Sequence, residues 1–79
     1  MTTMTRAHFR LIAGTLAAEK ANLKQTAQYA RETGDNVLMM GVATSMTTVD
    51  RLAHEFAREL AGTNPMFKRD TFLVACGVN

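Results

Sequence analysis

Side chains that could take part in catalysis are few in this chain of 79 residues, namely His8, Ser45, His54 and Cys76. A nucleophile or a general base works only when a neighbouring group activates or orients it, and none of the four has such a partner at motif spacing. His54 comes four residues after Asp50 on the polar face of an expected helix, which is typical of a solvated histidine. The sequence therefore predicts a protein without catalytic activity.

The sequence also offers no set of ligands for a metal or a cofactor. Zinc sites need three or four ligands at characteristic spacing, whereas the two histidines and the one cysteine of this chain are scattered. We expect neither a bound metal nor a cofactor.

Cys76 has no second cysteine with which to form an internal disulfide. A small protein from an oxidising compartment usually carries several cysteines, so the sequence indicates a reducing cytoplasm. Cys76 follows Phe72 and Leu73 at helical spacing, and free cysteine is among the residue types most often buried. We predict a core position for Cys76, with an intermolecular disulfide as the alternative.

Charged residues are spread along the chain and leave a formal net charge of +2, from nine Lys and Arg against seven Asp and Glu. Without a run of like charge, the chain lacks most of the basic footprint of a nucleic-acid-binding protein. Charged helix faces can instead contact another protein. The candidate partner-binding residues are Arg51, Arg58, Lys68 and Arg69, together with the segment 34–47.

Length and composition predict one domain over residues 1–79 with enough apolar area for a small core, since 47% of the residues are hydrophobic. The N-terminal residues lack the apolar region of a signal peptide, and no stretch has the roughly 18 apolar residues of a membrane span. We expect a soluble cytoplasmic protein that has no membrane partner.

Apolar residues at helical spacing predict helices over residues 5–20 and 22–33. Gly34, Asp35 and Asn36 then form the strongest break in the sequence. Glycine reaches positive φ freely, and Asp and Asn favour turns and helix starts.

Residues 36–61 are predicted to be helical, either as one long element or as two, with the second beginning at Thr47 or Thr48. The second half of this segment has the clearest pattern, with an apolar face opposite a charged one. Arg51 and Glu55 stand four residues apart on the charged face and are expected to form an ion pair.

Two glycines and a proline predict how the last helices end. Gly62 is expected to cap the long helix in a left-handed conformation. Pro65 is a second stop signal, because it forces Asn64 out of the helical region. A short last helix over residues 68–76 follows, and Gly77 is expected to stop it.

These elements predict an all-α fold, a compact bundle of three to four helices in which the short C-terminal helix packs back on a long one. The last two helices resemble a helix-turn-helix in outline, with Lys68 and Arg69 where recognition residues would lie. Residues 71–76 are almost wholly apolar or small, whereas a recognition helix presents polar side chains to base edges. We expect this helix to clamp the core and not to bind nucleic acid.

The stretch from His54 to Gly77 resembles a recurrent ending of small phage and prophage proteins, in which Asn-Pro, Phe, Phe-Leu and Ala-Cys-Gly follow one another. In this chain the matching residues are Asn64-Pro65, Phe67, Phe72-Leu73 and Ala75-Cys76-Gly77. The segment from His8 to Ala13 resembles the opening helix of those proteins. Residues 21–47 have no counterpart, and Lys68 stands where an acidic cap is common.

The resemblance implies a scaffold encoded by a phage. Phage proteins of this size without an enzyme motif commonly block a host machine, and anti-CRISPR proteins are the best-known group. The resemblance thus implies a non-catalytic inhibitor that binds a host defence complex in the bacterial cytoplasm, with a homodimer left open. The alternatives are a small helical regulator that binds nucleic acid and a phage accessory subunit with homotypic contacts.

Overall fold

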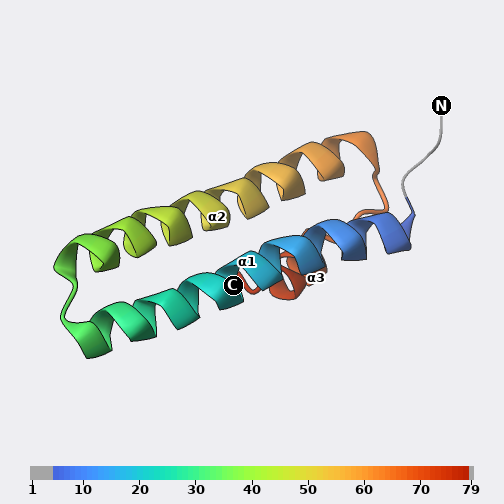
Figure 1. The fold of residues 1–79 in the computed structure, drawn as a ribbon. Coiled ribbons are helices and arrows are strands. Elements are labelled where there is room, and N and C mark those ends of the chain that lie inside the picture. Colours follow the sequence, from blue (N-terminus) through green and yellow to red (C-terminus); the bar gives the residue numbers. More distant parts are fainter. Residues whose placement is uncertain (1–4, 79) are drawn as a thin grey trace.

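The computed structural model describes residues 5–78, and this part of the chain consists of three α-helices and contains no strand. The order is α1 (Arg6–Thr33), α2 (Asn36–Thr63) and α3 (Arg69–Ala75). Figure 1 shows α1 and α2 side by side as a long antiparallel hairpin, with the short α3 packed against one half of it. The predicted all-α class is confirmed.

α1 is one helix of 28 residues in place of the two helices expected over 5–20 and 22–33. The expected break is wrong because the residues around position 21 are mostly good helix formers and include neither Gly nor Pro. At the beginning of α1, the backbone N–H of Thr5 donates to His8 Nδ1 at 3.0 Å. Nothing in the local sequence ends α1 before Gly34.

The turn between α1 and α2 lies at Gly34 and Asp35, as the sequence predicts. Gly34 has φ 69°, and the N–H of Asp35 donates to Ala30 O at 2.9 Å, which closes α1 with a Schellman motif. Asp35 Oδ1 accepts from the N–H of Leu38 at 3.0 Å and caps α2. Because the connection is so short, the two long helices must run antiparallel.

α2 is also one helix of 28 residues, so the single element is the correct alternative for residues 36–61. The hydroxyls of Thr44, Thr47 and Thr48 each donate to the carbonyl four residues earlier at 3.1 Å. These hydroxyls are therefore satisfied inside a continuous helix and do not cap a new one.

The end of α2 is set by proline and not by glycine. The expected cap at Gly62 is wrong, because Gly62 lies inside the helix and does not have the positive φ of such a cap. α2 continues to Thr63, where Pro65 holds the next residue, Asn64, in an extended conformation at φ −142° and ψ 106°.

The hydrophobic core lies where α3 packs over the seam between α1 and α2. α3 contributes Phe72 and Leu73, which are 4% and 7% exposed, and Cys76 directly after α3 is fully buried. The other members of the core cluster are Ala13, Ala53, Ala57, Leu60 and Val78. α3 thus packs against both long helices at once.

The molecule is elongated, with extents of 48 × 22 × 18 Å, and is not the compact bundle that the sequence analysis expects. The reason is that α3 has only seven residues and covers only part of the hairpin. In the other part, α1 and α2 contact each other through small buried side chains such as Ala27, Ala30 and Val42. Such side chains allow a close approach of two helices but bury little area.

Candidate protein-binding surfaces

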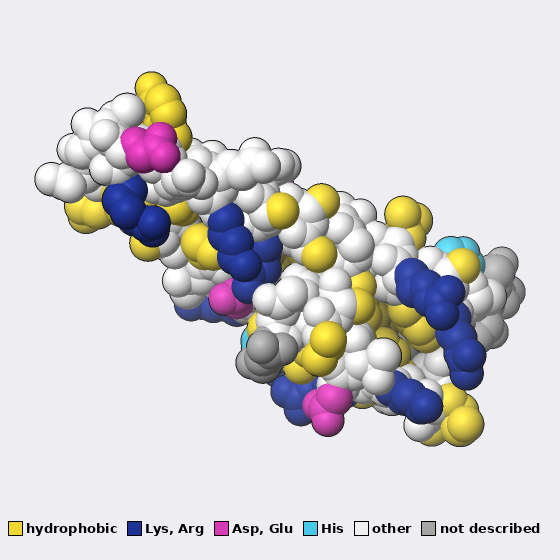
Figure 2. Space-filling model, turned by 90° about the horizontal axis from the view of Figure 1, so that it is seen from below, with side chains coloured by type: hydrophobic (Ala, Val, Ile, Leu, Met, Phe, Trp, Pro, Cys, Tyr) yellow, Lys and Arg dark blue, Asp and Glu magenta, His cyan; other side chains and the backbone are white. Residues whose placement is uncertain are grey.

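The four candidate partner-binding residues are all exposed, but the structure does not gather them into one cluster. Arg51 and Arg58 lie on α2 about two turns apart, and Lys68 and Arg69 lie at the beginning of α3. Figure 2 shows Lys and Arg side chains distributed along the molecule, with acidic side chains among them. The predicted residues are therefore separate charges on two elements.

Arg58 is paired with acidic side chains of its own helix. Its Nη2 forms an ion pair with Glu55 and lies 3.8 Å from Glu59 Oε1. The predicted pair between Arg51 and Glu55 is wrong, because Glu55 pairs with Arg58 instead. Arg51 consequently has no acidic partner within residues 5–78.

α3 is poorly suited to reading DNA. It has only seven residues, and Phe72 and Leu73 point into the core. The side chains left exposed include Asp70, Thr71 and Val74. The carboxylate of Asp70 would repel the phosphates of a DNA backbone. Phe72 and Leu73 thus pack into the core as predicted, whereas the apolar side chain of Val74 is exposed.

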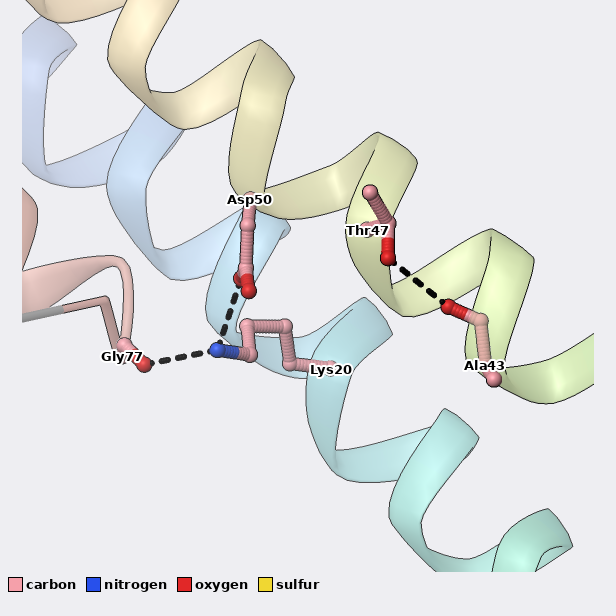
Figure 3. A network of polar contacts seen from close by, with 5 residues as sticks. All are labelled: Lys20, Ala43, Thr47, Asp50 and Gly77. Atoms are coloured by element: carbon pink, nitrogen blue, oxygen red, sulfur yellow. Dashed lines mark hydrogen bonds and ion pairs between the residues drawn. The ribbon is translucent and has the colours of Figure 1, made fainter.

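Lys20 joins all three parts of the fold at one point. Its Nζ lies 2.8 Å from Asp50 Oδ1 on α2 and donates to the backbone O of Gly77, just after α3, at 2.9 Å. Figure 3 shows the ammonium group between these two partners, and the side chain is only 12% exposed. Lys20 is not among the residues predicted from the sequence, because Gly77 is 57 residues away and no local spacing signals the contact.

Gly77 ends α3 as the sequence predicts. It has φ 79°, and the N–H of Val78 donates to Leu73 O at 2.9 Å, which is a Schellman motif. The turn presents the carbonyl of Gly77 to Lys20 at the negative end of the helix dipole, where a cation is favourable. The Lys20 contact therefore marks the point at which α3 stops covering the seam.

Beyond the Lys20 contact, the seam continues as an open groove of about 520 Å³, which we call the distal groove. Its lining residues are Lys24, Ala27, Gln28, Arg31, Glu32 and Met46. Ala27 is buried and Met46 half-buried, so they form the floor, while Lys24 and Arg31 are exposed at the rim. α3 covers the seam in one half of the hairpin and leaves it open here.

The two cations of the distal groove have no acidic partner within residues 5–78. Lys24 and Arg31 are seven residues apart on α1, which separates them by about 10 Å along the helix axis. Glu32, the one acid of the groove, accepts a hydrogen bond from Gln28 Nε2 at 3.2 Å. Met46 lies within the predicted contact segment 34–47, whereas neither Lys24 nor Arg31 is among the residues predicted from the sequence.

Cys76 occupies the core position that the sequence predicts, and its thiol is free. Burial raises the pKa of the Cys76 thiol above its ordinary value of 9.0, and the nearby charge of Lys20 lowers that pKa by a smaller amount. The thiol is therefore protonated and shielded at neutral pH, a state in which it reacts slowly.

We expect the stability of the folded chain to fall as the pH rises above 9.0. In the unfolded chain the thiol ionises at its ordinary pKa, whereas in the folded chain it stays protonated to higher pH. Raising the pH therefore favours unfolding. Urea unfolding followed by circular dichroism from neutral to alkaline pH measures the effect. The control is Cys76→Ala, and an equally steep alkaline loss in that variant would assign the effect to other groups.

Within residues 5–78, no group of three or more His, Cys, Asp or Glu is placed to hold a metal ion, and no helix is long and apolar enough to cross a bilayer. The chain matches no protein-family model, no curated protein and no solved structure. The relation to small phage proteins therefore rests on the C-terminal ending and the opening helix alone, and it stays a prediction.

Proposed function

We propose that this protein is a non-catalytic inhibitor, encoded by a phage, that binds a defence complex of the CRISPR-Cas type in its bacterial host. It would act in the host cytoplasm and block the complex through protein-protein contacts. The observation that carries the proposal is the distal groove, the stretch of seam that α3 leaves uncovered. The resemblance to small phage proteins supplies the phage origin and the host target. An inhibitor of this kind needs a rigid complementary surface and no reactive group.

The covered half of the hairpin indicates what the distal groove accepts. There, α3 inserts Phe72 and Leu73 into the seam. The groove lies on the same side of the hairpin, because Lys24 comes one helical turn after Lys20, which contacts the end of α3. A helix is therefore the natural occupant of the open half.

The lining of the distal groove defines the chemistry of the partner helix. Ala27 and Met46 offer a small and adaptable apolar floor, and methionine is common at binding surfaces that adjust to a partner. Lys24 and Arg31 at the rim favour acidic side chains about two turns apart on the partner. The groove thus suits an amphipathic helix with an acidic edge.

We expect the double variant Lys24→Glu/Arg31→Glu to lose inhibition, since both rim cations become acidic and repel the acidic edge of the partner. Reversal of two interface charges is expected to weaken binding by about 100-fold or more. The measurement is the survival of a CRISPR-targeted phage on a host that expresses the protein, together with co-purification of the defence complex from that host.

Charge reversal of Arg51, Arg58, Lys68 and Arg69 in one variant is the companion experiment, because these remain the predicted contacts. If this variant loses inhibition and Lys24→Glu/Arg31→Glu does not, the contact surface lies at the four predicted residues and not at the distal groove. A wild-type chain that neither protects the phage nor recovers a host complex would contradict the inhibitor proposal. Recovery of phage proteins would then indicate an accessory subunit, and salt-dependent binding to random duplex DNA would indicate a regulator.

A further inference from the structure

Apolar side chains are exposed on the side of the hairpin opposite α3. Leu52 and Phe56 of α2 are 45% and 41% exposed. Helix geometry places both about 120° or more around α2 from Asp50, which faces the end of α3 through Lys20. They therefore point away from α3 and from the distal groove.

Ile12 extends this apolar surface onto α1. The contact between Lys20 and Asp50 sets the register of the two antiparallel helices, and it places Ile12 beside the turn of α2 that carries Phe56. Ile12 is half-buried and packs on the core from its edge. We call the surface formed by Ile12, Leu52 and Phe56 the back face.

The chain exposes more surface than a compact protein of its mass. It exposes 5877 Å² in total, whereas a folded monomer of 8.7 kDa is expected to expose about 4,700 Å². Its radius of gyration is 14.8 Å, against about 11.6 Å for a compact domain of this length. The excess of about 1,100 Å² follows from the elongated shape, in which the long helices keep faces that no other part of the described chain covers.

We propose that a second copy of this chain covers the back face, with the two α2 helices antiparallel around a two-fold axis near His54. This rotation sets Leu52 of each copy against Phe56 of the other, so one pair of side chains forms the contact twice. It also brings Arg51, which lacks an acidic partner in its own chain within residues 5–78, beside Glu55 of the second copy. The apolar contacts and the charge pair thus both favour a second copy of this chain as the partner.

Sedimentation equilibrium of the full chain tests the proposal. The wild-type chain is expected to be a dimer, and Leu52→Glu/Phe56→Glu is expected to raise the dissociation constant by at least about 100-fold. Both residues are exposed, so the variant is expected to keep its helical circular dichroism and dissociate into folded monomers. The matched control is Val74→Glu, which places the same charge at a 65% exposed apolar site on α3 and is expected to leave the dimer intact.

A wild-type chain that stays monomeric up to millimolar concentration overturns the proposal, as does a Leu52→Glu/Phe56→Glu variant that remains dimeric. The proposal is also overturned if Val74→Glu raises the dissociation constant as much as Leu52→Glu/Phe56→Glu does, because Val74 lies on the other side of the hairpin.

A charge exchange tests the antiparallel arrangement of α2. Arg51→Glu and Glu55→Arg are each expected to weaken the dimer, and the double variant is expected to restore it. A double variant weaker than either single one would contradict the arrangement. The dimer does not depend on the inhibitor proposal, since Lys24→Glu/Arg31→Glu changes the opposite side and is expected to leave the dissociation constant unchanged.

Discussion

Replacing Phe72 by alanine is expected to leave a large fraction of the molecules unfolded at 25 °C. Phe72 is 4% exposed, and its ring lies 5.4 Å from that of Phe67, which in turn meets the ring of Phe9 edge-on at 5.1 Å. Removal of a buried phenylalanine costs about 3 to 5 kcal/mol. A single small core supplies about the same total stability to a chain of this length.

Urea and thermal unfolding monitored by helical circular dichroism measure this loss. The matched control is Val74→Ala on the same helix, where the side chain is 65% exposed and the change is expected to stay within about 0.5 kcal/mol. If Phe72→Ala unfolded at the same urea concentration as Val74→Ala, α3 would not be a structural part of the core. The aromatic contacts between α1, the segment before α3 and α3 itself would then have no energetic role.

Replacing Lys20 by methionine is expected to lower the free energy of unfolding by about 1 to 3 kcal/mol. Methionine keeps the apolar stem but leaves Asp50 Oδ1 without its ion pair and the carbonyl of Gly77 without its donor. Removing one partner of a fully buried pair costs about 3 to 5 kcal/mol. We expect less here because, although Asp50 Oδ1 is buried, the Asp50 side chain as a whole is 44% exposed and can turn toward solvent.

Lys24→Met is the matched control for this variant. Lys24 lies one turn further along the same face of α1, and within residues 5–78 it has no acidic partner, so its loss is expected to change stability by no more than about 0.5 kcal/mol. Adding Asp50→Asn to Lys20→Met removes the unpaired carboxylate and is expected to recover part of the lost stability. Equal unfolding curves for Lys20→Met and Lys24→Met would contradict a stabilising role for Lys20.

The Lys20 contact also links stability to the proposed binding surface. It holds the end of α3 at the boundary between the covered half of the seam and the distal groove. A chain in which α3 detaches would expose the core residues Phe72 and Leu73 and would lengthen the groove. Variants of Lys20 are therefore expected to alter partner binding as well as unfolding, whereas variants of the back face leave α3 in place.

Features that depend on a few neighbouring residues could be predicted from the sequence. The turn at Gly34 and Asp35 and the stop at Gly77 were correct because positive φ favours glycine whatever the tertiary contacts. The burial of Cys76 was also predicted, since an apolar pattern on so short a helix leaves only one face for packing. The predicted cap at Gly62 failed because helical hydrogen bonds continued through it until Pro65 ended them.

Features that depend on how the helices meet were decided only by the tertiary structure. The seam of small side chains sets the register of α1 against α2, and that register brings Lys20 to Asp50. The side on which α3 packs then determines that Lys24 and Arg31 border an open groove while Leu52 and Phe56 form a separate exposed face. No local pattern contains this information, because helix periodicity shows which residues share a face but not which partner that face meets. The sequence by itself thus determined the helical class, the turns at Gly34 and Gly77 and the burial of Cys76, whereas packing between distant segments decided the candidate surfaces.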